Sequence, residues 1–202
     1  MKYKCITGGP ISENCYLLID EKTNQAAVVD PGFLNDVLLN EIKKYTVQRI
    51  LLTHGHFDHI WEADRLHEML GVPVCAYETE AAFAADDKQN GSLLMMYESI
   101  TCKVHEAFKD GETFQIGEVP VTVLHTPGHT AGGVSYITPD AVFTGDTLMG
   151  YSVGRCDLPT GNSAELRESL KKLAALPGNP DICGGHGHVT TLEDEKRRNP
   201  YL

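Results

Sequence analysis

The sequence predicts an α/β fold in which two β-sheets pack face to face and helices cover their outer sides. Each half of the chain runs through several strand-like segments before a longer helical one. No low-complexity linker or repeat of fixed period interrupts this order, and 202 residues with 42% apolar content suffice for one well-filled core. We therefore expect a single domain over residues 1–202.

The first half predicts strands that alternate with helices. Apolar runs bounded by turn residues predict strands over residues 14–20, 26–32, 47–53 and 72–77. Apolar residues at helical spacing predict helices over residues 34–45, 60–70 and 78–85. The stretch 86–104 is less regular. We interpret its residues 93–97, with two methionines and a tyrosine, as a loop that packs into the core, with a cover over the functional site as the alternative.

The second half starts again with strands. They are expected over residues 112–116, 119–126, 133–138 and 141–146. Asn162 is a suitable N-cap for a helix over 163–176, and Glu165 stands in the capping-box position. A last strand and turn follow in "DICGGHGH", and residues 193–198 predict a mixed-charge surface.

Composition excludes several classes of protein. The formal net charge of −11 argues against binding of a nucleic-acid backbone, which needs clustered Lys and Arg. No stretch approaches the ~20 apolar residues that span a bilayer, and the N-terminus lacks the apolar core of a signal peptide. The six cysteines form no CxxC pair, which is typical of reduced thiols in a cytoplasmic protein.

Histidines and aspartates gather at the predicted strand ends. "THGHFDH" places His54, His56, Asp58 and His59 directly after an apolar run, and glycine-flanked residues end three later strands. These later residues are His129, Asp146 and His186. A lone histidine in a loop is usually a surface residue, but the joint pattern favours a metal site.

The seven side chains suit two divalent cations. Zinc accepts imidazole and carboxylate ligands, usually four or five for each ion, and iron or manganese is possible too. Seven ligands serve two ions only if one is shared, and Asp146 is the natural bridge because a carboxylate can bridge. A water held between two such cations has its pKa lowered towards ~7.

The motifs resemble those of the metallo-β-lactamase fold superfamily, and specifically its compact glyoxalase II-like hydrolases. "THGHFDH" matches the family's HxHxDH signature, and "TPGHT", "GDT" and "GGHG" match its later ligand motifs in order. "VVDPG", "GRCDLPTG" and "EKRRNPYL" are similar to further segments of such members. The resemblance implies a four-layer αββα sandwich of two mixed sheets, without a separate C-terminal glutathione-binding helical domain.

The resemblance also implies how the metals are held. His54, His56 and His129 would bind the first ion, and Asp58, His59 and His186 the second. Asp146 would be shared, and Asp58 and Asp146 would act in catalysis by holding the ions around a bridging hydroxide, the nucleophile. Asp30 and His125 are candidates to orient metal ligands through hydrogen bonds, although Asp30 could instead only cap its turn.

The expected activity is hydrolysis of a small thioester, such as S-lactoylglutathione, with no nucleic-acid or membrane partner. Arg155 could contact an anionic group of the substrate or could form an ion pair with Asp157. Cys156 has no histidine near it in sequence and is not expected to be a nucleophile.

Two other activities fit the motifs. Persulfide dioxygenases share this fold and use one iron, which His54, His129 and Asp146 could hold. A lactone hydrolase is also consistent with the chemistry. The bridging Asp146 argues against a β-lactamase.

Overall fold

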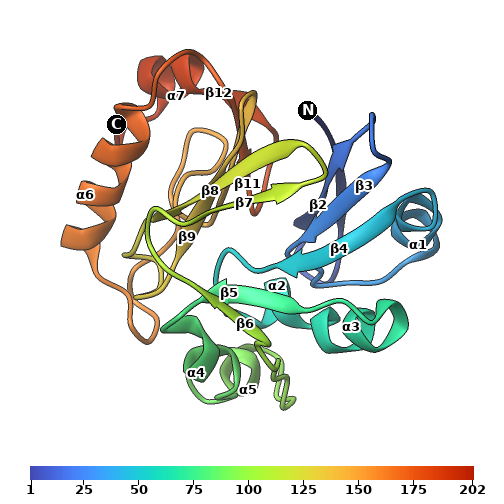
Figure 1. The fold of residues 1–202 in the computed structure, drawn as a ribbon. Helices are drawn as coiled ribbons and strands as arrows, with labels where there is room; N and C mark the ends of the chain where they lie inside the picture. The colour runs from blue at the N-terminus through green and yellow to red at the C-terminus, as the bar shows by residue number, and fades with distance from the viewer.

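The computed structural model describes residues 1–202 and contains two six-stranded sheets that face each other (Figure 1). The first sheet has the strand order β1-β2-β3-β4-β5-β6, with bounds Lys2–Gly8, Glu13–Asp20, Gln25–Val29, Thr46–Leu51, Val74–Tyr77 and Glu106–Phe108. The second has the order β12-β11-β10-β9-β8-β7. In chain order from β7 its strands are Thr113–Ile116, Val119–His125, Val134–Ile137, Ala141–Gly145, Asp181–Gly184 and Thr190–Thr191.

Both sheets are mixed. In the first, β1, β2 and β3 are antiparallel neighbours, and β3 to β6 run parallel. In the second, only β10 and β11 are parallel. The seven helices α1 to α7 span Asp36–Ile42, Phe57–Ile60, Ala63–Leu70, Glu80–Ala84, Ser92–Met95, Ser163–Ala174 and Leu192–Arg198. No helix has both the length and the apolar character that crossing a bilayer requires.

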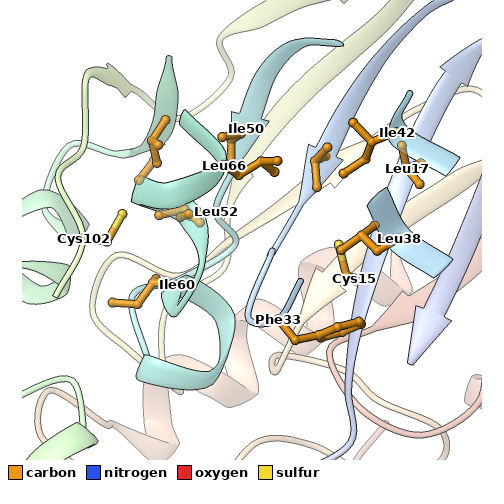
Figure 2. Packing of buried hydrophobic residues seen from close by; sticks show 14 of the residues in the cluster. Cys15, Leu17, Phe33, Leu38, Ile42, Ile50, Leu52, Ile60, Leu66 and Cys102 are labelled. Carbon is orange, nitrogen blue, oxygen red and sulfur yellow. The ribbon is translucent and has the colours of Figure 1, made fainter. Parts of the chain in front are cut away.

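The side-chain alternation of β2 explains the layers. All eight residues of this strand are buried, because both of its faces are covered. Tyr16 and Leu18 belong to the apolar cluster between the two sheets. Leu17 and Ile19 point the other way, into a cluster with Leu38 and other residues of the first sheet's helices (Figure 2). The predicted αββα sandwich is confirmed.

The second sheet is covered on its outer side by α6. Leu166, Leu170 and Leu173 of this helix pack with Val142 and Ile182 of β10 and β11. The predicted N-cap is confirmed, since the Asn162 side chain accepts hydrogen bonds from the N–H groups of Ala164 and Glu165.

Several segments depart from the sequence prediction. Strands β1 and β12 and helix α7 have no predicted counterpart, and the predicted helix over 60–70 meets α2 at one residue only. Strand β6 and helix α5 lie next to or within a stretch expected to be irregular. Helix α7 covers the mixed-charge run: its acidic residues fill the first turn and its basic residues the last, which complements the helix dipole. Charge composition alone did not reveal it, because only Leu192 and Glu195 of this helix are buried.

The expectation that residues 93–97 pack into the core is wrong. Leu94 is 65% exposed and Tyr97 is 91% exposed, and only Met96 packs partly against the first sheet's cluster. The segment instead forms α5 and a turn on the surface, because a single short helical turn cannot bury five large residues on one side.

Candidate metal centre

The densest group of polar side chains follows strand β4. After Leu51 the chain passes through Thr53 to His56 and enters α2, and every residue from Thr53 to Ile60 is buried. Gly55 is needed in this turn, since a Cβ there would lie 2.9 Å from Glu80 Oε2. The Gly55 N–H donates to that same oxygen at 2.8 Å. The conformation of this turn is therefore held by Glu80 of α4 as well as by the turn's own residues.

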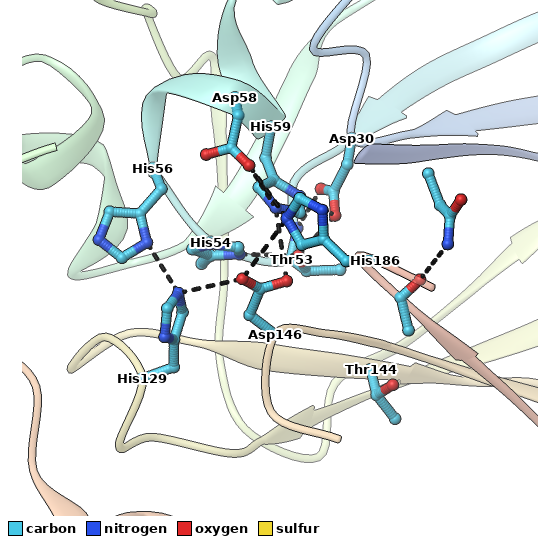
Figure 3. A network of polar contacts seen from close by, with 12 residues as sticks. Asp30, Thr53, His54, His56, Asp58, His59, His129, Thr144, Asp146 and His186 are labelled. Atoms are coloured by element: carbon cyan, nitrogen blue, oxygen red, sulfur yellow. Dashed lines mark hydrogen bonds and ion pairs between the residues drawn. The ribbon is translucent and has the colours of Figure 1, made fainter. Parts of the chain in front are cut away.

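The structure brings all seven sequence-predicted side chains together (Figure 3). One group contains His54, His56 and His129, and another contains Asp58, His59 and His186. Within each group the potential ligand atoms lie within 4.8 Å of one another. These two groups have the members that the resemblance implied, and a third group, of Asp30, His54 and His59, crosses between them.

Asp146 lies between the two groups. Its Oδ2 is 3.4 Å from His129 Nε2 in the first group, and its Oδ1 is 3.5 Å from His59 Nε2 in the second. Asp146 follows β10 and His186 follows β11, and these parallel strands end at the same edge of the sheet. Gly185 makes the close approach possible, because a Cβ at this position would collide with Asp146 Oδ1.

Buried atoms without partners show that the cluster fits divalent cations. The Nε2 atoms of His54, His56 and His59 and Oδ1 of Asp146 are buried and make no hydrogen bond. In addition, the His56 Nδ1 and His129 Nε2 atoms face each other at 2.8 Å. Leaving such groups buried and unpaired is costly, whereas nitrogen and oxygen donors of this kind satisfy a borderline divalent metal.

Hydrogen bonds orient three of the rings. His59 Nδ1 donates to Asp30 Oδ2 at 2.9 Å, and His129 Nδ1 donates to the carbonyl of Arg155 at 2.7 Å. His54 Nδ1 lies 3.1 Å from the hydroxyl of Thr53. Each contact leaves Nε2 turned towards the cluster, as metal-binding histidines require. Asp30 therefore does more than cap its turn.

The electrostatics differ between the two groups. Burial lowers the pKa of His54 well below its usual value, and burial with the neighbouring His129 lowers that of His56 to about 3. These rings are neutral at physiological pH and keep a lone pair for a cation. In the second group, burial raises the pKa of Asp58, but His59 and His186 outweigh burial and lower it overall.

Two other predicted site residues, Arg155 and His125, do not contact the seven side chains through their own side chains. The Arg155 guanidinium forms two hydrogen bonds to Asp157, at 2.6 and 2.8 Å, so the ion pair left open by the sequence is present. The expectation for His125 is wrong. Its ring stacks on Tyr77 and its Nε2 bonds to the carbonyl of Ala131, because β8 turns its last residue away from the cluster.

Sequence reasoning missed Glu80 and Glu13. Glu80 is buried and accepts hydrogen bonds from the N–H groups of Gly55 and Gly132, at 2.8 Å each. Glu13 is fully buried with both carboxyl oxygens unpartnered, and burial raises its pKa to about 9. A carboxylate on the buried side of the predicted helix 78–85 was a signal for Glu80, whereas nothing local marked Glu13.

A cavity of about 190 Å³ opens onto the cluster. His56, Asp58, His129, Asp146 and His186 form its polar wall. Its other lining residues are Ile11, Phe57, Met95, Met149, Gly154, Arg155 and Leu158. Five of the seven side chains therefore face an accessible space, as in a catalytic centre and unlike a sealed structural site.

The chain is similar in sequence to two proteins that are named as hydrolases. It is 36% identical over 208 residues to Probable metallo-hydrolase YqgX of Bacillus subtilis, and the alignment covers 100% of this chain and 98% of that protein. It is 31% identical over 209 residues to Hydroxyacylglutathione hydrolase GloC of Haemophilus influenzae, with 100% and 98% covered.

Solved structures agree with the fold. BLEG-1, a B3 metallo-β-lactamase, superposes with a TM-score of 0.93 at 34% identity, over 100% of this chain and 99% of that one. TTHA1623 in a di-iron-bound form gives a TM-score of 0.84 at 34% identity, over 98% and 100%. The sequence model of a family described as "Metallo-beta-lactamase superfamily" matches residues 8–186. With the sandwich fold and the histidine cluster at its edge, this match shows that the chain belongs to the metallo-β-lactamase superfamily.

Proposed function

We propose that the protein is a hydrolase that uses two divalent metal ions to cleave a small thioester, with S-lactoylglutathione as the first substrate to test. The observation that carries the proposal is the pair of three-residue groups with Asp146 between them. The six free cysteines favour a reducing compartment, and we place the protein in the cytoplasm.

The metal ions would be held as the geometry suggests, with His54, His56 and His129 around one and Asp58, His59 and His186 around the other. When bound, two such cations supply an acidified water and polarise a carbonyl group. Asp30 and the Arg155 carbonyl keep the His59 and His129 rings in place for this role. Zinc is our first choice, and the di-iron form of TTHA1623 makes iron the second.

The reaction adds water across the C–S bond. The water oxygen bonds to the carbonyl carbon, the C–S bond breaks, and the sulfur leaves with the electron pair. One proton of the water goes to the sulfur and the other to solvent, so that a carboxylate and a thiol result. The cavity is smaller than the ~300–1,000 Å³ of pockets that hold a drug-sized ligand. The acyl end of a thioester therefore enters, and its thiol carrier stays at the mouth. Arg155 lines the cavity and would contact an anionic carrier by exchanging Asp157 for it.

The similarity to GloC supports a thioester, and the similarity to BLEG-1 supports hydrolysis of an acyl bond in general. The alternative of a one-iron persulfide dioxygenase would use His54, His129 and Asp146. In that case Asp58, His59 and His186 would hold nothing. Lactone hydrolysis would use the same two-metal centre as the thioesterase.

One preparation tests these activities together. Protein reconstituted separately with zinc and with iron is analysed for metal content and assayed on S-lactoylglutathione, a lactone, a β-lactam and glutathione persulfide, with oxygen uptake recorded for the last. We expect two metal ions per chain and turnover of the thioester. Oxygen uptake with one iron per chain, or turnover of the β-lactam or lactone alone, would overturn the proposal.

A further inference from the structure

The walls of the cavity that are not metal-ligand candidates are almost wholly apolar. Ile11, Phe57, Met95, Met149 and Leu158 line it, and Arg155 is the one further polar side chain. The Arg155 guanidinium is already engaged by Asp157. The Gly154 N–H donates to the carbonyl of Asp146. Apart from the half-exposed Arg155 guanidinium, which keeps N–H groups that Asp157 does not use, the side chains of these walls offer no hydrogen-bonding group to a polar substituent on a substrate.

The apolar surface continues outside the cavity. Eight large apolar side chains are exposed on this protein, and five of them lie at residue 11 or within residues 93–97. They are Ile11, Leu93, Leu94, Met95 and Tyr97. Ile11 and Met95 also line the cavity, so both segments stand at its mouth. An apolar patch that continues into a catalytic cavity marks a ligand-binding surface rather than scattered exposure.

We propose that this cavity favours a short aliphatic acyl group, straight or branched, over a hydroxyacyl group. The inference rests on the proposed thioester hydrolysis and names its substrate class. A hydroxyl placed against the apolar side chains of these walls loses its water without gaining a partner, whereas a methyl group at the same position gains apolar contact. The limited volume restricts the chain to a few carbons.

A matched pair of thioesters tests the proposal. S-isobutyrylglutathione differs from S-lactoylglutathione only by a methyl group in place of the hydroxyl. Each kcat/KM is divided by the rate constant for hydroxide-catalysed hydrolysis of the same compound, which removes differences in reactivity. We expect the normalised ratio to favour the isobutyryl substrate by roughly 5- to 100-fold. A ratio of one or below would overturn the proposal.

Variants locate the preference. Met95→Ser and Ile11→Ser should each lower the isobutyryl-to-lactoyl ratio about threefold or more, since they remove apolar surface at the mouth. Both residues are more than 40% exposed, so the fold does not depend on them. Met69→Ser is the matched control, because Met69 is 52% exposed on α3 and does not line the cavity. An equal effect of the control would contradict the assignment.

A binding measurement separates this inference from the proposed function. Isobutyrate and lactate, the acids that the two reactions would release, are titrated into metal-loaded protein and followed by calorimetry. Both carry the same carboxylate, and the titrations are repeated without metal, because the lactate hydroxyl can chelate a bound ion. The difference in metal-free protein reports the side chain. Tighter binding of isobutyrate without turnover of either thioester would remove the proposed function and leave the pocket preference standing. Tighter binding of lactate would overturn the preference.

Discussion

At the scale of single residues, Asp30 shows how much one side chain contributes to the centre. Its carboxylate accepts hydrogen bonds from the Thr53 N–H, the Thr53 hydroxyl and His59 Nδ1. Its backbone has a φ of +50°, a left-handed conformation that costs a non-glycine residue about 1 kcal/mol or more. The surrounding contacts hold it there, and the result is a fixed His59 ring.

Asp146 is the residue on which both groups depend. Asp146→Ala should abolish hydrolysis and lower the metal content, because it removes the carboxylate whose two oxygens face the two groups. Inductively coupled plasma spectrometry and the thioester assay measure both effects. His67→Ala serves as the control and should change neither, since His67 stacks on His105 and bonds to the carbonyl of Val72. Full metal and turnover in the Asp146 variant would refute its bridging role.

At the scale of elements, α4 holds together two loops that carry metal-ligand candidates. Glu80 begins this helix and binds Gly55, which lies between His54 and His56, and also Gly132, which follows His129. The three imidazoles of the first group are thus placed by one carboxylate that none of them contacts. This positions two loops that are more than 70 residues apart in the sequence.

Glu80→Gln should therefore weaken the first metal group specifically. An amide can accept from only one of the two N–H groups with its oxygen and turns its NH₂ towards the other, which costs roughly 1–3 kcal/mol of the free energy of unfolding. Loss of ligand orientation lowers metal affinity by about 10- to 100-fold. Urea unfolding and competition with a chelator measure the two effects. The exposed Glu78→Gln is the control, and equal values for both variants would disprove the positioning role.

A second contact between elements joins the two sheets at their edge. Asp20 ends β2 and accepts hydrogen bonds from the Glu118 N–H, between β7 and β8, and from the Thr23 hydroxyl. Both hydrogen bonds lower the pKa of Asp20, and the bond from the Glu118 N–H has the larger effect. A lowered folded-state pKa adds stability above the unfolded value of about 3.9 that is lost as the pH falls through the folded value.

The difference in free energy of unfolding between the wild type and Asp20→Asn should accordingly shrink as the pH is lowered from about 5 to about 2. Urea titrations at a series of pH values give this difference directly. A difference that stays constant, or grows towards low pH, would show that the Asp20 carboxylate does not couple the two turns.

At the scale of the whole molecule, the cores form apart from the centre. Clusters of 19, 16 and 7 buried apolar residues fill the spaces between the four layers. The candidates lie at one edge, after the strands end. Burial of apolar surface therefore stabilises the fold without help from a bound ion.

Removal of metal should leave the protein folded but less stable. After chelation, the far-UV circular dichroism spectrum should be retained while Tm falls, and Tm should rise again with the concentration of added zinc, because the ion binds only the folded state. Calorimetry with and without metal measures the shift. Unfolding on chelation would instead mean that the centre, and not the three clusters, holds the sheets together.

Part of this molecule could be predicted from the sequence because the signals are local. The long apolar strands, the helix capped by Asn162 and all seven histidine and aspartate positions follow from short patterns in which neighbours determine the outcome. Metal chemistry restricts ligand types so strongly that the HxHxDH spacing indicated a site before any contact was known.

The tertiary structure alone decided what depends on distant segments. The bond from Asp30 to His59, the link of Glu80 to two loops, the stacking of His125 on Tyr77 and the exposure of Met95 at the cavity each result from contacts between segments that are far apart in the sequence. A residue type specifies which bonds a side chain can make. Which of them it makes is set by the groups that long-range packing brings within about 3 Å, and no local pattern contains that information.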